Sequence, residues 1–246
     1  LAITLAVGVQ KMAKQNAIVR KMNAVETLGS ATVICTDKTG TITLNRMVVQ
    51  EIVLPQKTYS ISHGGLDPYA TRRDPILAKA VEIMALCNNA MEVISEGKEE
   101  MTGDPTERAL LSAVAACGAN GRRIRANHRL AGEVPFDADR KMMSAIRLYG
   151  MKRFALVKGA PEKVIPRCSR ILARRGEQKM TSEWRKKFSS DSHSLGAQSM
   201  RVLALAFRPI GKLPKYTPAN TEKSLVFVGL VAMEDPPRQE VAQAID

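Results

Sequence analysis

The chain has 246 residues, carries a formal net charge of +13, and is 45 % apolar but only 4 % aromatic. This apolar fraction excludes an intrinsically disordered chain, and the length suffices for one large domain or two modest ones. The four cysteines form no C-x-x-C pair, so neither a disulfide framework nor a zinc site is indicated, and a reducing compartment is expected.

The first ten residues, LAITLAVGVQ, form a nearly continuous apolar run, and the cations Lys11, Lys14, Arg20 and Lys21 follow it. Ten residues cannot span a bilayer, which requires about 20. A cleavable signal peptide would carry its cations before the apolar run rather than after it. Cations after the run are typical of the cytoplasmic end of a membrane helix, although a buried helix of a soluble protein fits the same pattern.

The run ATVICT, residues 31–36, predicts a short buried strand that leads directly into DKTGT, residues 37–41. A carboxylate at the carboxyl end of a parallel strand can attack a phosphoryl group. The neighbouring amides and hydroxyls can bind phosphoryl oxygens, and Mg²⁺ would keep carboxylate and phosphate together. An ordinary turn in which Asp37 pairs with Lys38 fits this stretch of sequence equally well.

Two helices are expected next. Residues 75–90 carry apolar side chains at spacings of three and four. The second helix has Asp104 at its N-cap, Pro105 at its first position and Gly118 as its C-terminal stop. Glu107 stands three residues after the cap, as in a capping box.

The pattern then changes to short apolar runs bounded by glycine, proline or charge, which predicts strands. These runs are residues 142–150, 153–160, 201–207 and 224–232. The last is apolar on both faces and is therefore expected inside the sheet. Helices are expected over 161–172 and 181–191, which makes the whole a mixed α/β chain.

The positive charge is concentrated in residues 163–187, a stretch that contains nine cationic and two anionic residues. A single aromatic residue, Trp184, accompanies them, whereas proteins that bind single strands interleave several aromatics with their cations. A solvated surface is therefore favoured, contact with an anionic membrane surface or an acidic domain comes second, and no nucleic-acid partner is expected.

Six motifs occur in an order and at a spacing that resemble the P-type cation-transporting ATPases. They are DKTGT (37–41), GDPTERAL (103–110), FDADRKMMS (136–144), FALVKGAPE (154–162), RVLALA (201–206) and DPPR (235–238). The resemblance covers essentially the whole chain. The KGAPE and DPPR elements resemble the type II branch, which includes calcium pumps.

This resemblance implies an α/β fold in which a mixed-sheet nucleotide-binding domain is inserted into a partial Rossmann-like (HAD-type) phosphorylation domain. Residues 1–21 would be the end of a transmembrane helix and stalk, and residues 22–46 the first part of the phosphorylation domain. The nucleotide-binding domain would span 47–234. Residues 235–246 would be a hinge and the truncated start of the second part of the phosphorylation domain.

The resemblance also implies the roles of the DKTGT residues. Asp37 would be the phosphorylated nucleophile, and Lys38 and Thr39 would contact the phosphate. Asp37 and the Thr39 carbonyl would bind Mg²⁺. The other Mg²⁺ ligands of the family lie in T-G-D and G-D-G-x-N-D elements, neither of which occurs in this sequence.

For ATP, the resemblance implies that Phe136 stacks on adenine, that Lys141 and Lys158 line the pocket, and that Gly159 lets the base approach closely. Arg201 would reach the phosphates, and Ala138 stands where the pumps often have a phosphate-binding arginine. Three implied contacts have simpler alternatives: Phe136 as a core residue, Lys158 as a surface lysine, and Asp104, implied on the adenine side, as a helix cap only. The family usually has Glu at position 104. The remaining implied contact is Arg238, at the hinge and the phosphate side.

The implied activity is ATP hydrolysis through an aspartyl phosphate that drives cation transport, with calcium the best guess and sodium, potassium, proton or magnesium as alternatives. The implied partners are ATP, the transported cation, and actuator and transmembrane domains of the same protein. The chain would be a cytoplasmic domain of an integral membrane protein, and by itself it would only bind nucleotide. Two alternative functions remain. One is a HAD-type phosphatase, but such enzymes usually have a second Asp at the position where this chain has Thr39. The other is a non-catalytic nucleotide-binding module.

Overall fold

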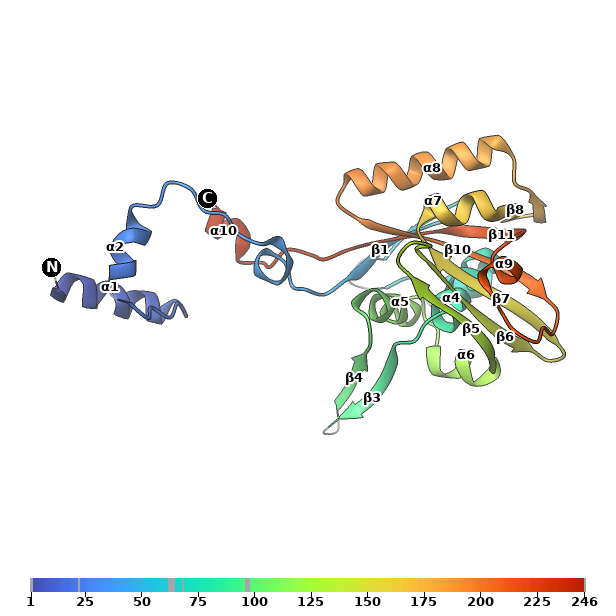
Figure 1. Ribbon diagram of the computed structural model, residues 1–246, viewed down its shortest axis with the longest axis horizontal. Helices are drawn as coiled ribbons and strands as arrows, with labels where there is room; N and C mark the ends of the chain where they lie inside the picture. The colour runs from blue at the N-terminus through green and yellow to red at the C-terminus, as the bar shows by residue number, and fades with distance from the viewer. Residues whose placement is uncertain (1, 22, 62–64, 68, 96–97, 246) are drawn as a thin grey trace. The chain divides into compact units, whose positions relative to one another are not determined.

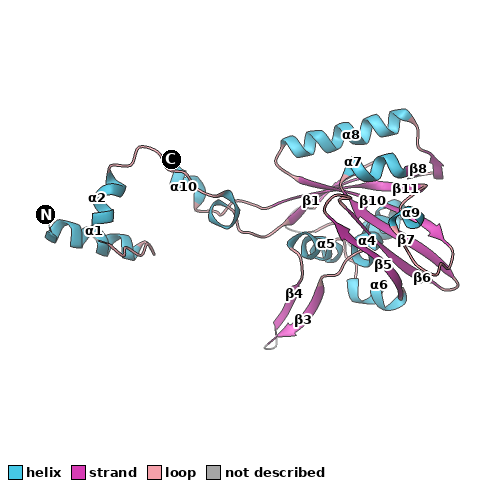
Figure 2. Cartoon of the chain, in the orientation of Figure 1, coloured by secondary structure: helices cyan, strands magenta, loops and turns pink. Residues whose placement is uncertain are grey.

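The computed structural model describes residues 2–21, 23–61, 65–67, 69–95 and 98–245. It divides into two compact units, Leu1–Ile42 and Thr43–Asp246. Figure 1 shows the elements of both units, and Figure 2 separates helices, strands and loops by colour.

The first unit contains the helices α1 (Ala2–Lys14) and α2 (Asn23–Gly29), followed by a tight turn at Lys38–Ile42. No described helix is both long enough and apolar enough to cross a bilayer. The strand expected at 31–36 is wrong. Val33 and Ile34 are 77 % and 81 % exposed, because no described strand pairs with this run, and an apolar run forms a strand only against a neighbour.

In the described part of the second unit, nine strands form one sheet. Its main path is β2 (Thr58–Ser60), β1 (Val48–Val53), β11 (Leu225–Glu234), β10 (Arg201–Ile210), β7 (Lys152–Gly159), β6 (Met142–Tyr149) and β5 (Leu130–Asp137). β8 (Cys168–Ala173) pairs with β11 in parallel, and β9 (Gly176–Lys179) pairs with β8. Along the main path, all pairs are antiparallel.

Helices cover both faces of this sheet (Figure 1). One face packs against α4 (Pro75–Leu86) and α5 (Pro105–Ala116), and the other against α7 (Pro161–Val164) and α8 (Ser182–Ala197). A hydrophobic core lies on each face of the sheet, and successive residues of a strand point alternately into one core and the other. On β7, for example, Leu156 belongs to the first core and Val157 to the second.

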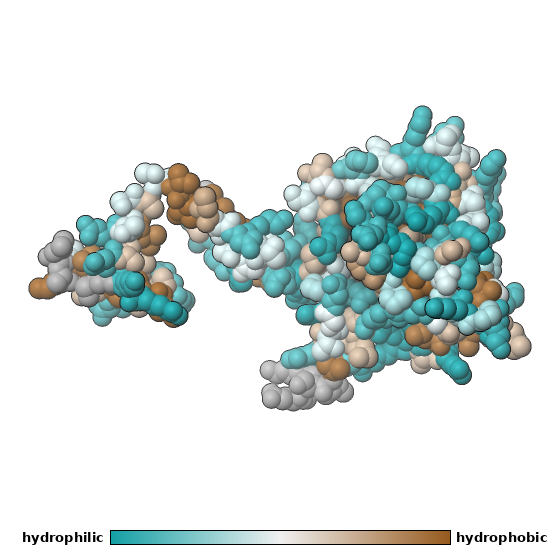
Figure 3. Space-filling model, viewed as in Figure 1, coloured by the Kyte–Doolittle hydropathy of each residue, from teal (hydrophilic) through white to brown (hydrophobic). Residues whose placement is uncertain are grey.

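The remaining elements are short. They are α3 (Ala70–Arg73), the hairpin β3 (Met91–Ser95) and β4 (Lys98–Thr102), α6 (Gly121–Asn127), the 3₁₀ turn Ile165–Arg167, α9 (Pro218–Thr221) and α10 (Val241–Ile245). The viewed surface of the second unit is mostly hydrophilic (Figure 3).

The structure confirms the strands that the sequence predicted from residue 142 onward, and it confirms the interior position of 224–232: only Glu234 of β11 is not buried. The helix predicted over 161–172 is wrong in its second half. There the chain forms β8, whose Arg170 and Ile171 pair with Val226 and Phe227, and pairing with a buried central strand outweighs local helix periodicity.

The capping box at α5 is also wrong. Asp104 caps the helix by accepting a hydrogen bond from the Thr106 amide, at 2.8 Å. Glu107 instead accepts hydrogen bonds from the Asn89 amide and the Lys158 ammonium group. An ion pair with a buried lysine is a stronger restraint on the carboxylate than a solvated backbone amide.

Replacing Gly229 with alanine is expected to destabilise the second unit by about 1–3 kcal/mol, the usual range for overpacking. A Cβ at this position on β11 would lie 2.6 Å from the carbonyl oxygen of Val53 and 2.7 Å from Leu54 Cδ2. Thermal or urea unfolding measures the effect. Gly211→Ala is the matched control, because a Cβ there meets nothing within 4 Å; equal stability of the two variants would contradict the packing.

The cysteines provide a second test of the fold. Cys35 is exposed, whereas Cys87, Cys117 and Cys168 are buried. Burial raises the pKa of the Cys87 and Cys117 thiols to about 11 and that of Cys168 to about 12, which leaves almost no reactive thiolate near neutral pH. A thiol-reactive disulfide reagent at about pH 8 should therefore label Cys35 rapidly and the other three only after unfolding in guanidinium. Rapid labelling of a Cys35→Ser variant would contradict this arrangement.

Candidate functional site

The ends of four antiparallel strands surround a cavity of about 770 Å³ at one edge of the sheet. β5 and β7 end there, while β6 and β10 begin there, so that Gly159 faces Met142 on one side and Ala204 on the other. The N-terminus of α5 completes the wall. Six residues singled out from the sequence line this cavity: Asp104, Phe136, Lys141, Lys158, Gly159 and Arg201.

A buried ion pair forms one wall of the cavity. Lys158 Nζ lies 2.6 Å from Glu107 Oε1, and the two side chains are only 8 % and 14 % exposed. Lys158 is therefore not a surface lysine. A buried ammonium group is tolerated only with a close counter-charge, and Glu107 holds it at the cavity wall.

Phe136 forms a second wall near the end of β5. It is 64 % exposed and so is not a core residue. Among the described residues, no aromatic ring contacts the Phe136 ring at stacking distance. A large apolar ring exposed at a cavity offers a stacking surface to a flat ligand.

The N-terminus of α5 is fixed by side chains from two elements. Asp104 serves as its cap and also lines the cavity. Arg201, at the start of β10, donates to Thr106 Oγ1 at 2.7 Å. Arg201 thereby ties the edge of the sheet to the helix and brings its guanidinium to the cavity.

Lys141 and Gly159 meet where β6 and β7 approach each other closely. Lys141 has a left-handed backbone, with φ of 52°, and its ammonium group lies 3.3 Å from Glu162 in an exposed pair. A Cβ on Gly159 would lie 2.5 Å from Met142 Cβ and 2.6 Å from the Lys141 carbonyl oxygen. Strand packing by itself therefore requires glycine at this position.

Three further cavity residues were missed as site residues by sequence reasoning. Glu107 was assigned to the helix cap, and Asn89 and Glu133 stand in no motif. Asn89 links the two carboxylates. Its backbone amide donates to Glu107, and its side-chain amide donates to Glu133 at 3.1 Å. The sequence carries no signal for this link, because Asn89 and Glu133 are 44 positions apart.

The cavity can accommodate a ligand with one flat apolar part and one anionic part. Phe136, Met143, Val202 and Leu203 supply apolar surface, while Lys141, Lys158 and Arg201 supply positive charge. The carboxylates of Glu107 and Glu133 can accept hydrogen bonds from an amino group. An apolar pocket with a few converging polar groups is typical of a small-molecule site.

Asp37, Lys38 and Thr39 lie in the first unit and are not among the residues that line this cavity. Asp37 is exposed, and its Oδ1 accepts a hydrogen bond from the Thr39 amide at 3.4 Å. Gly40 takes a positive φ of 79° in the turn that follows. Among the described residues, no three His, Cys, Asp or Glu side chains are grouped as a metal would require. Asp37 offers hard oxygen donors, which suit Mg²⁺ when phosphate and water complete its coordination.

Arg238 follows β11 and does not line the cavity either. Near Arg238, Asp235 joins the segment after β11 to the segment before β1: it accepts from Thr43 Oγ1 at 2.5 Å and from the Arg46 amide at 2.9 Å.

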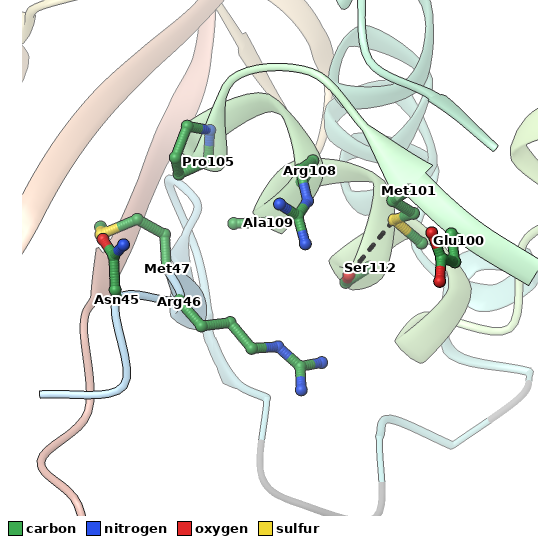
Figure 4. A pocket seen from close by; sticks show the side chains of 9 residues that line it. All are labelled: Asn45, Arg46, Met47, Glu100, Met101, Pro105, Arg108, Ala109 and Ser112. Carbon is green, nitrogen blue, oxygen red and sulfur yellow. Dashed lines mark hydrogen bonds between the residues drawn. The ribbon is translucent and has the colours of Figure 1, made fainter. Parts of the chain in front are cut away.

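Arg46 and Arg108 line a separate hollow of about 620 Å³ (Figure 4). Both arginines are exposed surface residues.

The sequence was compared with models of protein families and with curated proteins. The family model described as "P-type ATPase, cytoplasmic domain N" matches residues 77–240, which include every cavity residue named above. The chain is 38 % identical over 250 residues to calcium-transporting ATPase 1 of Bacillus cereus and 39 % identical over 246 residues to a calcium-transporting ATPase of Listeria monocytogenes. It is 34 % identical over 263 residues to the human sodium/potassium-transporting ATPase subunit alpha-2.

All of this chain is covered in each comparison, but it spans only 26 %, 27 % and 26 % of the length of these three relatives. The matched family, the order of the motifs and the antiparallel sheet with its edge cavity agree with one another. The chain belongs to the P-type ATPase family and contains its cytoplasmic domain N.

Proposed function

We propose that the cavity at the sheet edge binds ATP, with the adenine ring stacked on Phe136. The observation that carries this proposal is the exposed Phe136 ring in the same cavity as the buried Lys158–Glu107 pair. Stacking needs an accessible ring face, and the phosphates need fixed cations. Lys141 and Arg201 stand at the cavity as phosphate contacts, and Gly159 leaves the base room to approach. Asp104 acts mainly through the helix cap.

In the complete protein, the γ-phosphate passes to Asp37, and an aspartyl phosphate forms. The carboxylate oxygen attacks the phosphorus, and ADP leaves with the electron pair of the bond that breaks. Lys38 and Thr39 hold the phosphoryl oxygens, and Arg238 acts at the hinge on the phosphate side. Mg²⁺ bound by Asp37 and the Thr39 carbonyl would supply neutralisation of the phosphate charge.

The same proposal includes the domain organisation. Residues 22–46 and 235–246 form parts of a Rossmann-like (HAD-type) phosphorylation domain, and the nucleotide-binding domain, 47–234, is inserted between them. Residues 1–21 are the end of a transmembrane helix and stalk. The chain is then a cytoplasmic part of an integral membrane pump, with actuator and transmembrane domains as its partners within the same protein.

The transported cation is proposed to be calcium, because relatives named as calcium-transporting ATPases are 37–39 % identical to this chain, against 34 % for the sodium/potassium-transporting relatives. Cation ligands would lie in membrane helices, so direct measurement of ion uptake by the complete protein distinguishes calcium from sodium, potassium, protons and magnesium.

Phe136→Ala is expected to weaken ATP binding by the 246-residue chain about tenfold, since stacking on an aromatic ring contributes roughly 1–3 kcal/mol per base. Calorimetric titration with ATP measures the change. Met151→Ala is the control, because Met151 is also an exposed apolar residue, at 97 %, and does not line the cavity. Undiminished affinity of Phe136→Ala would refute the stacking.

Asp37→Asn in the complete protein is expected to abolish labelling from γ-³²P-ATP, because the amide cannot act as the nucleophile. Wild type should give an acid-stable label that hydroxylamine removes, as an acyl phosphate requires. Asp191→Asn, which changes a partly exposed carboxylate on α8 that pairs with Lys187, is the control and should label like wild type. A label that persists in Asp37→Asn, or its absence in the wild type, would exclude the phosphoenzyme mechanism and favour a non-catalytic nucleotide-binding module.

A further inference from the structure

The end of β5 makes a tight turn that carries two cavity residues, Phe136 and Lys141. The register between β5 and β6 shifts between Val134 and Asp137, so the ladder is interrupted there. Asp137 closes the turn: its carboxylate accepts from the Arg140 amide at 2.8 Å, and its carbonyl accepts from the Lys141 amide at 2.7 Å. These contacts close the turn but do not attach it to the core.

At the Lys141 end, the turn is attached next to β7, because the Ala160 amide donates to the Lys141 carbonyl at 2.9 Å. At the Pro135 end, the Arg140 side chain supplies the attachment. One guanidinium nitrogen donates to the carbonyl oxygen of Pro135 at 2.5 Å, and another donates to Glu222 Oε1 at 2.5 Å. The Pro135 carbonyl belongs to the peptide unit whose nitrogen is that of Phe136. A hydrogen bond to this oxygen therefore fixes the peptide plane from which the Phe136 ring projects.

Glu222 is a firm anchor because it is buried. Its side chain is 1 % exposed, that of Arg140 is 13 % exposed, and Glu222 Oε1 also accepts from Ser144 Oγ at 2.7 Å. Among the described residues, Glu222 Oε2 has no hydrogen-bond partner. A buried carboxylate with one unpartnered oxygen depends on its counter-charge, so the Glu222–Arg140 pair is strongly held together.

The Phe136 ring is only weakly restrained by packing. Its ring is mostly exposed and belongs to neither hydrophobic core. A mostly exposed ring depends on its backbone for its position, and Arg140 holds the carbonyl of the peptide that precedes it. Arg140 does not line the cavity, so it acts on a ligand only through the turn.

We propose that Arg140 and Glu222 are positioning residues for the nucleotide site: together they hold the 135–141 turn in the conformation that presents Phe136 and Lys141 to the ligand. The proposal rests on the proposed function in assigning ATP to this cavity. When the turn loses its anchor, only a fraction of molecules is competent to bind, and the apparent dissociation constant rises in inverse proportion to that fraction.

The test compares wild type with Arg140→Met and Arg140→Lys in the 246-residue chain. Both variants are expected to bind ATP about tenfold more weakly, the change expected if about one molecule in ten holds the competent turn. Lysine keeps the charge but lacks the planar fork that reaches two acceptors. Wild-type affinity in Arg140→Lys would therefore overturn the bridging role.

Arg147→Met is the control for general destabilisation. Arg147 is also a largely buried arginine, and it donates to the backbone carbonyls of Leu86 and His128, neither of which lines the cavity. It should lower the melting temperature without weakening ATP binding by the folded protein. If Arg147→Met weakens binding as much as Arg140→Met does, the effect is general destabilisation, and the proposal fails.

Two readouts separate this proposal from the assignment of ATP. Amide hydrogen exchange without nucleotide should accelerate at Arg140 and Lys141 in the Arg140 variants and in Glu222→Gln, but not in Arg147→Met; unchanged protection would overturn the proposal whether or not the wild type binds ATP. The double variant Phe136→Ala/Arg140→Met should lose less ATP affinity than the sum of the two single losses, because part of the Arg140 effect acts through the Phe136 ring. Fully additive losses would show that Arg140 acts by another route.

Discussion

The second unit depends on the pairing of β11 with three other strands. β11 lies between β1 and β10 in the antiparallel sheet and also pairs with β8 in parallel. Nine of its ten residues are buried, so both cores contact it, one on each face. Burial of apolar surface on both faces is the largest favourable term available to a strand. The helices, the sheet edge and the cavity are positioned from this strand outward.

The antiparallel pairing of β1 with β11 has a second consequence. The start of β1 and the end of β11 lie next to each other, with Val48 opposite Glu234. The segment before β1 and the segment after β11 therefore lie together, where Asp235 accepts hydrogen bonds from Thr43 Oγ1 and the Arg46 amide.

The second unit contains two ion pairs with different surroundings, one that lines the cavity and one that contacts the 135–141 turn. In the cavity, Lys158 and Glu107 form a buried pair, with one partner from the sheet and the other from α5. Behind it, Arg140 and Glu222 form a second pair that contacts the turn rather than the cavity. Buried pairs of this kind contribute little net stability, but their geometry is specific, since removal of one partner leaves an uncompensated charge.

The sequence by itself determined the local features of this protein. Periodicity and punctuation identified the strands β6, β7, β10 and β11 and the helices α4, α5 and α8, because the alternation of apolar and polar residues follows directly from which face is buried. Asp104 and Pro105 marked the start of α5 because capping depends on residues that are close in sequence. The motifs led to the family and to six of the residues that line the cavity.

Only the tertiary structure decided which partners those residues take. Glu107 and Lys158 are 51 positions apart, and Arg140 and Glu222 are 82 positions apart, so no local pattern relates them. The same reason explains the errors: β8 forms because β11 is beside it, and residues 31–36 form no strand because no described strand pairs with them. Residue types and spacing fix local conformation and possible chemistry, whereas contacts between distant segments depend on the register of the sheet, which the whole chain sets together.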